Sequence, residues 1–216
     1  MTQMKPQLRD RLTGILSLHG WCSRNKAIHM AQLILDNKPE VLVEVGVFGG
    51  RGCLAMAMAC QHSYHGHVHA IDPWTKEAAL EEGVNEEHDK WWATVNLDQI
   101  YATFVSNMHQ MGLQDWVTIH RQHDTEAVHH FADGSVQFLH LDGNHAEGIA
   151  LRSSKIWEPK LAPGAVLVFD DVLWPSNKVA LDWLRAHPQF TDLGEFDMMD
   201  EKGEVAGRYA VFQRTL

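Results

Sequence analysis

The chain has 216 residues, 45% of them hydrophobic, and a formal net charge of −10. A chain of this length can bury roughly 70% of its unfolded surface as one domain, which we expect to span residues 1–216. The acidic balance and the lack of a basic run argue against a nucleic-acid or membrane partner.

The N-terminus lacks the long apolar stretch of a secretory signal or of a membrane-spanning helix. The three cysteines, Cys22, Cys53 and Cys60, are an odd number without a paired framework. Such cysteine usage is typical of a reducing compartment, so we expect a cytoplasmic protein.

The first expected elements are two helices, near residues 4–17 and 24–37, in an N-terminal helical cap over residues 1–38. Ser23 is suited to cap the second helix, whose apolar residues recur at helical spacing. The next elements alternate between strand and helix. They are a strand at 41–45, a glycine-rich turn at 46–52, a helix at 53–61 and a strand at 67–71 that ends at Asp72.

Residues 74–98 are acidic, contain tryptophan and show weak periodicity. A stretch of this length between elements is usually a lid or a substrate loop. Trp74, Trp91 and Trp92 could form an apolar wall over a substrate, or they could anchor the lid to the core.

The second half of the chain continues the alternation. We expect helices at 100–111, 125–131, 146–161 and 178–186, strands at 116–120, 135–141 and 165–169, and a hairpin at 190–212 with its turn at 201–203. Strands that alternate with helices predict a single, doubly wound, mostly parallel Rossmann-like α/β sheet, here with a C-terminal antiparallel hairpin. Ligands of such sheets bind beyond the carboxyl ends of the strands.

The glycine-rich turn and Asp72 predict a nucleoside-containing cofactor. Glycines at 46, 49, 50 and 52 allow a tight turn and a close approach to a ligand. The helix that follows offers free N–H groups, and Asp72 can accept hydrogen bonds from two ribose hydroxyls. The spacing differs from the dinucleotide fingerprint, which disfavours a nicotinamide cofactor. The alternative is that these glycines serve only as turn residues.

Three carboxylates follow two strands of the second half: Asp142 after the first, and Asp170 and Asp171 after the second. Neighbouring parallel strands would bring all three to one edge of the sheet. Crowded carboxylates repel each other unless a positive group lies between them, and the simplest such group is Mg2+. Alternatively, Asp170 and Asp171 cap the following helix.

Histidines at 62, 65, 67 and 69 match no structural zinc spacing, and no cysteines lie near enough to complete one. We interpret them as surface residues around a helix-to-strand turn.

Three segments together resemble class I S-adenosylmethionine-dependent methyltransferases. VEVGVFGGRGCLAMA resembles the first motif of that superfamily, and HAIDPW resembles its second strand. The segment 136–171, VQFLHLDGNHAEGIALRSSKIWEPKLAPGAVLVFDD, is similar to the small cation-dependent O-methyltransferases, both the catechol type and the sugar type of macrolide and aminocoumarin biosynthesis. The resemblance covers roughly residues 40–175.

The resemblance implies a role for each matching residue. S-adenosylmethionine would be held by Glu44, Gly46, Phe48, Gly50 and Asp72, with His123 and Asp124 near the adenine ring. Asp142, Asp170 and Asp171 would hold Mg2+ or another divalent cation, which would bind the acceptor hydroxyl and lower its pKa. The acceptor would be a small hydroxylated molecule.

The sequence departs from these families at the general base. The catechol type has a lysine three places after the first metal carboxylate, and here that residue is His145. The sugar type has an aspartate two places after it, and here that residue is Asn144, which cannot accept a proton. His145 could act as the base, as a hydrogen-bond partner or as a metal ligand. Gly52 also departs, since the catechol type often has a hydroxyl residue there.

Two other functions remain open at this stage. The chain could transfer methyl groups without a metal, or it could be a non-catalytic nucleoside-binding protein on the same scaffold. The oligomeric state is open too, with a homodimer through the N-terminal helices or the terminal hairpin as one arrangement.

Overall fold

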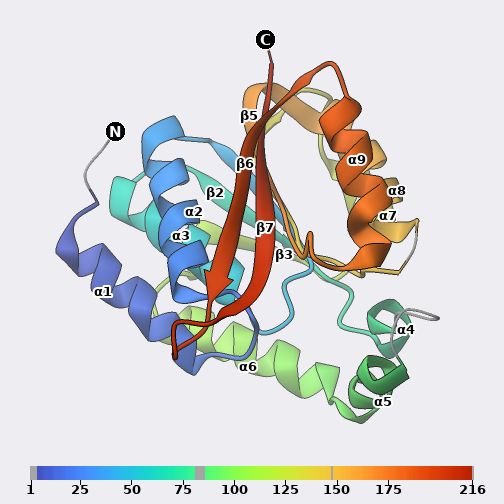
Figure 1. Ribbon diagram of the computed structural model, residues 1–216. Helices are drawn as coiled ribbons and strands as arrows, with labels where there is room; N and C mark the ends of the chain where they lie inside the picture. Colours follow the sequence, from blue (N-terminus) through green and yellow to red (C-terminus); the bar gives the residue numbers. More distant parts are fainter. Residues whose placement is uncertain (1–3, 81–85, 147, 216) are drawn as a thin grey trace.

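The computed structural model describes residues 4–80, 86–146 and 148–215. Its strands form one seven-stranded sheet in the order β3-β2-β1-β4-β5-β7-β6 (Figure 1). The strands are β1 (Val41–Val45), β2 (His67–Ile71), β3 (Val117–His120), β4 (Val136–Leu141), β5 (Leu161–Phe169), β6 (Phe190–Met199) and β7 (Val205–Arg214). β1 to β5 are parallel, and β7 runs antiparallel to both β5 and β6. The predicted fold class is therefore confirmed.

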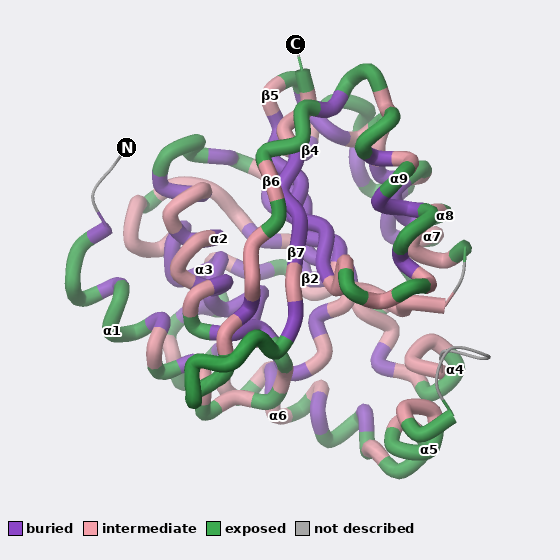
Figure 2. The backbone as a smooth tube through the Cα atoms, viewed as in Figure 1, coloured by how far each residue is buried: buried purple, intermediate pink, exposed green. Residues whose placement is uncertain are grey.

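Helices cover both faces of this sheet (Figure 1). One face carries α1 (Pro6–Gly14), α2 (Arg24–Asn37), α3 (Arg51–Ser63) and α6 (Leu97–Gln110), and the other carries α7 (Asp124–Ala127), α8 (Ile149–Trp157) and α9 (Lys178–Ala186). Side chains of a strand alternate between the faces, so Leu42 joins the first core and Val43 the second. Central parallel strands are buried on both faces, as Figure 2 shows, which explains their continuous apolar runs.

Local signals fix several element ends. Ser23 caps α2 as expected, because its side chain accepts a hydrogen bond from the backbone N–H of Lys26. The helix expected at 146–161 is shorter, since α8 starts after Gly148, whose φ is +83°, and ends before Pro159. Short 3-10 turns occupy several helix and strand ends, namely Ile15–Ser17, Gln114–Trp116, Val128–His130, Glu158–Lys160 and Pro175–Asn177.

Residues 74–98 are not the long loop that weak periodicity suggested. They contain α4 (Lys76–Ala79) and α5 (Glu86–Thr94), while 81–85 lie outside the described residues. Neither helix has a buried residue, and Figure 1 shows both set apart from the two helical layers. A surface helix without a clear apolar stripe gives little periodic signal. The lid function of this segment stays a prediction.

The order of the strands creates a crevice between β1 and β4. From β1, the chain proceeds to β2 on one side and later to β4 on the other, so the connections leave the sheet in opposite directions. Backbone hydrogen bonds continue past the strand ends, from Gly46 to Ile71 (2.9 Å), from Asp142 to Val45 (2.9 Å) and from Asp170 to Leu141 (3.0 Å). These bonds bring the predicted cofactor loop and the predicted metal ligands to one edge.

Two further observations concern compartment and membrane. Cys22, Cys53 and Cys60 are all unpaired and buried. Over the described ranges, no helix combines the length and the apolar character needed to cross a bilayer.

Candidate functional site

A cavity of about 800 Å³ opens at the carboxyl edge of the sheet. Cavities of this size hold ligands as large as a nucleoside cofactor. Its lining includes nearly all residues predicted for the site, namely Glu44, Gly46, Phe48, Asp72, His123, Asp124, Asp142, His145, Asp170 and Asp171. The exception is Gly50. It precedes α3, and a Cβ atom at Gly50 would overlap the ring of Phe104, so packing alone already requires glycine there; its cofactor role stays a prediction.

The glycine loop is shaped by its contacts with neighbouring strands. Gly46 has φ +86°, and a Cβ atom there would overlap the backbone of Asp142. Gly52 faces Glu44 in the same way, because a Cβ atom would overlap the Glu44 carboxylate. The hydroxyl residue that the catechol type often has at this position would therefore meet the Glu44 side chain here.

Asp72 holds the loop in place. Its Oδ2 atom accepts hydrogen bonds from the N–H groups of Val47 (3.0 Å) and Phe48 (2.9 Å), and its Oδ1 atom from that of Trp74 (2.7 Å). Burial raises the pKa of Asp72, and these N–H groups oppose that rise. A carboxylate has about four lone-pair positions and these N–H groups use three, so Asp72 can still accept a hydrogen bond from one ribose hydroxyl. The ribose role stays a prediction.

Trp74 anchors this region instead of forming a substrate wall. Its side chain is 2% exposed, its Nε1 atom donates to the Phe48 carbonyl (2.8 Å), and its ring stacks on Phe104. Trp92 instead lines the cavity and meets the Phe48 ring edge-on at 5.4 Å. Trp74 therefore anchors the segment to the core, and the substrate wall stays a prediction for Trp92.

Glu44 is paired with a residue that the sequence analysis missed. Its Oε1 atom lies 2.8 Å from His140 Nδ1, and both side chains are buried. Burial raises the pKa of Glu44 well above its ordinary value, with Asp142 adding to the rise, and lowers that of His140 well below, with Lys26 adding to the fall. Both shifts favour a neutral pair. The sequence feature that could have revealed this pair is the presence of His140 within the apolar run of β4.

The two residues predicted near the adenine ring differ in environment. His123 is exposed at the cavity rim. Asp124 is buried, and its carboxylate accepts a hydrogen bond from Ser153 Oγ (2.5 Å) and lies 3.4 Å from Arg152. Asp124 thus ties α7 to α8 at the edge of the cavity.

The three predicted metal ligands are close together, in two overlapping groups that share Asp142. Asp142, Asp170 and His140 form one group, and Asp142, Asp171 and His145 form the other. Within each group, one ligand atom per residue lies within 4.8 Å of the others. Burial raises the pKa of Asp142 to about 6, although Lys26 acts to lower it.

Lys26 of α2 reaches into the first group. Its side chain is fully buried, its Nζ atom contacts Asp170 Oδ2, and the same atom lies 3.6 Å from Asp142 Oδ2. The sequence analysis missed this residue. The sequence feature that could have revealed it is the position of this lysine on the buried stripe of α2, beside Ala27 and Met30. An unpaired charge there would be costly, so a buried partner is expected.

His145 belongs to the second group. Its Nε2 atom lies 2.9 Å from Asp171 Oδ2, and its ring stacks on Trp174 with 5.3 Å between ring centres. Burial alone would raise the pKa of Asp171, but the contact with His145 brings it below the ordinary value. Asp171 has φ +51°, a rare backbone conformation that is typical of functional loops.

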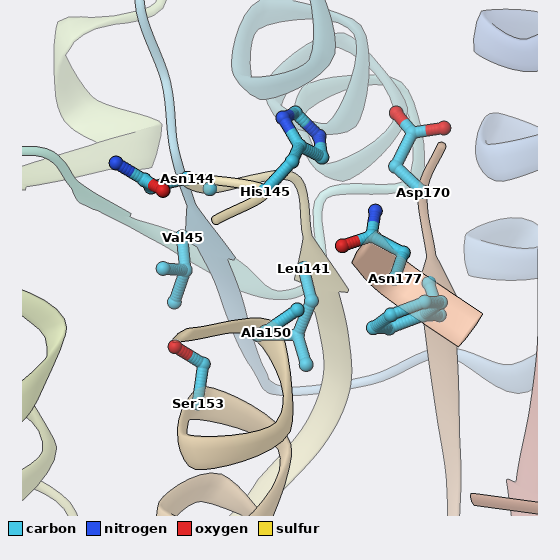
Figure 3. Close-up of a pocket in the computed structure, with 10 residues that line it drawn as sticks. Val45, Leu141, Asn144, His145, Ala150, Ser153, Asp170 and Asn177 are labelled. Atoms are coloured by element: carbon cyan, nitrogen blue, oxygen red, sulfur yellow. The ribbon is translucent and has the colours of Figure 1, made fainter. Parts of the chain in front are cut away.

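Asn144 holds the loop after β4 to the segment around α4. Its Nδ2 atom donates to the carbonyls of Ala78 (2.9 Å) and Leu80 (2.7 Å). Asn144 and Asp170 both line a small void of about 20 Å³. Figure 3 shows the Asn144 side chain directed away from Asp170. Asn144 therefore has a structural role where the sugar type has its base.

The site fits S-adenosylmethionine better than it fits Mg2+. Glu44 Oε2 is buried without a hydrogen-bond partner in the described part of the chain, so it can accept one from the cofactor's amino group. For Mg2+ the three carboxylates would have to converge on one ion. Asp170 instead contacts the Lys26 ammonium, which a bound dication would repel. The predicted trio therefore does not form a simple magnesium site.

Comparisons with known proteins agree with the fold. No curated protein matches the chain in sequence. The O-methyltransferase TomG from Streptomyces achromogenes, involved in tomaymycin synthesis and solved with SAM, aligns with a TM-score of 0.69 at 13% identity, over 99% of this chain and 92% of that one. An O-methyltransferase from Bacillus cereus, solved with SAH, aligns with a TM-score of 0.67 at 13% identity, over 98% and 92%.

The sequence match is more direct. Residues 43–172, more than half of the chain, match the family described as Methyltransferase domain. This segment contains the glycine loop, Asp72 and every predicted metal ligand. The chain therefore belongs to the methyltransferase-domain family, within the class I S-adenosylmethionine-dependent methyltransferases that its sequence resembles.

Proposed function

We propose that this protein transfers the methyl group of S-adenosylmethionine to a hydroxyl group of a small molecule. The observation that carries the proposal is that one cavity of about 800 Å³ is lined both by the glycine loop with Asp72 and by His145 with Asp171. A cofactor held by the loop and a proton acceptor at His145 would then share one cavity, as in-line transfer requires.

The cofactor supplies a methyl group activated by the sulfonium. On the protein side, the loop after β1 and Asp72 would hold the nucleoside, and Glu44 would accept a hydrogen bond from the amino group. The cavity walls, formed in part by Phe48 and Trp92, would exclude water from the acceptor.

His145 would take the proton of the acceptor hydroxyl. A histidine has an ordinary pKa near neutrality, so it can accept a proton at physiological pH. Asp171, 2.9 Å from Nε2, would stabilise the imidazolium that results, and stacking on Trp174 would fix the ring plane. The oxygen would then be free to accept the methyl group, and the bond electrons would stay on the cofactor's sulfur, which would leave as a neutral thioether.

The test is a methyl-transfer screen over catechols, flavonoids and glycosides. We expect His145→Ala to lower kcat by about a hundredfold or more while S-adenosylmethionine binding, measured by calorimetry, is retained. His129→Ala, which removes an exposed histidine elsewhere, is the matched control and should be active. Full activity of His145→Ala would remove the histidine from the mechanism, and failure of the wild type to bind the cofactor would leave only a non-catalytic function.

Dependence on a divalent cation is what the resemblance implies, and the site offers one observation for it and one against it. The two groups around Asp142 support it, because carboxylate and imidazole atoms gather there. The Lys26 contact supports the metal-independent alternative, because it already supplies a positive charge to Asp142 and Asp170.

A further inference from the structure

The surroundings of Lys26 are those of a bound ammonium ion. Its Nζ atom contacts Asp170, lies 3.6 Å from Asp142 and lies 5.6 Å from the centre of the Tyr209 ring. Two carboxylates and an aromatic face are suitable partners for a monovalent organic cation. Mg2+ instead prefers an octahedron of oxygen atoms.

The helix that carries Lys26 is held in place on both sides of it. Asn25 donates to the carbonyl of Asp197 (2.6 Å) and accepts from the N–H of Met199 (2.9 Å), which ties α2 to β6. His29 Nδ1 lies 2.8 Å from the Tyr209 hydroxyl. The ammonium is therefore a fixed part of the fold and not a surface side chain that has folded inward.

We propose that Lys26 is the built-in counter-ion of Asp142 and Asp170, in the position that the resemblance gives to a divalent cation, and that this enzyme needs no such cation. Lys26 itself does not line the cavity. It acts as a positioning residue, because it holds two carboxylates that do line it. The catalytic half of this inference rests on the proposed methyl transfer, whereas the metal-binding half does not.

The wild-type protein provides the first test. Metal-stripped protein should bind no stoichiometric Mn2+ in an EPR titration at millimolar metal, and EDTA should leave turnover unchanged. An Mn2+ site that is lost in Asp142→Asn, or loss of turnover in EDTA, would overturn the proposal. The Mn2+ result is decisive even if no acceptor is found, so failure of the proposed function can be told apart from failure of this inference.

Substitution of Lys26 provides the second test. Lys26→Ala should lower kcat by about a hundredfold, because the two carboxylates lose their alignment. The same variant should gain an Mn2+ site, since its acids are left without a counter-charge, and added Mg2+ should restore part of the turnover. A purely structural lysine would produce no new metal site. Mn2+ binding to Lys26→Ala no tighter than to the wild type would therefore contradict the proposal.

Two variants serve as controls. Lys160→Ala removes a lysine that lies 2.7 Å from Asp133, outside the cavity, and should neither gain an Mn2+ site nor lose turnover. Lys26→Arg keeps the charge and should bind no Mn2+, which covers the case that Lys26→Ala does not fold. A metal site in Lys26→Arg as strong as in Lys26→Ala would count against the counter-ion role.

Discussion

Gly46 joins the cofactor loop to the acids, because its backbone lies against that of Asp142 with no room for a side chain. We expect Gly46→Ala to destabilise the fold by roughly 3 kcal/mol, from a strained φ of +86° together with a backbone clash. Urea unfolding measures the loss. Gly134→Ala is the control, since its φ is +70° but no atom lies near its Cβ position. Equal losses in the two variants would show that only φ, and not the contact with Asp142, matters.

Single residues of the site were predictable only where their position at the end of a strand assigns them to the carboxyl edge of the sheet. Asp142, Asp170 and Asp171 were expected to lie together because neighbouring parallel strands share an edge, and Asp142 does lie near each of the other two, in separate groups. Lys26 was not expected, because its partner Asp170 lies 144 positions away and helix periodicity does not identify the strand that a helix covers. His140 lies on β4 opposite Glu44 of β1, and it was missed because the register of the two strands cannot be read from either segment alone.

Strands β2 and β3 carry a histidine pair on neighbouring positions of the sheet. His69 Nδ1 lies 3.0 Å from His120 Nε2, with His67 beside the first ring and His130 stacked on the second. Burial, together with the neighbouring His120 and His67, lowers the pKa of His69 from 6.5 to about 4. The folded state therefore favours neutral rings at these strands.

The consequence is a loss of stability in mild acid. Between pH 6.5 and pH 4 the unfolded chain binds a proton at this position that the folded chain rejects, so stability falls as the pH falls through this window. Urea midpoints should be lower at pH 5 than at pH 7. His69→Gln should reduce the difference, and an unchanged difference would mean that other groups cause the acid sensitivity.

Elements were predictable where the signal is local. β1, β2, α2 and α9 begin and end where apolar spacing and caps place them. β5 is longer than its apolar core suggested, starting at Leu161 instead of 165, because pairing with β4 continues past a register shift near Val136. Such extension depends on the neighbouring strand and cannot be seen in one segment.

At the scale of the molecule, α5 lies against the glycine loop after β1 through aromatic contacts. Trp92 meets Phe48 and Trp91, and Trp21 from the segment before α2 stacks on Phe48 at 5.0 Å. These rings come from three separate parts of the chain and meet beside the cavity. The lid over the acceptor, which the length of residues 74–98 suggested, stays a prediction that this arrangement supports.

Removal of the lid contact should weaken acceptor binding. Trp92→Ala should raise KM for the acceptor by about tenfold, the loss expected for one buried aromatic contact, with a smaller effect on cofactor affinity. Steady-state kinetics and calorimetry separate the two. Trp91→Ala is the matched control, because this ring is on the same helix but does not line the cavity. A larger effect at Trp91 would place the acceptor elsewhere.

Helix α2, from the first part of the chain, is bound to strand β6, from the last part. Asn25 forms hydrogen bonds with the backbone on either side of Met198. During synthesis on the ribosome, the helix with Lys26 emerges first, and the strands that fix it emerge last. Until β6 and β7 are made, Lys26 and Asp170 are both present in the growing chain, but the strand that holds α2 in place is missing. A nascent polypeptide that stops before residue 190 should therefore contain every residue predicted to hold the nucleoside and still lack an ordered acidic centre.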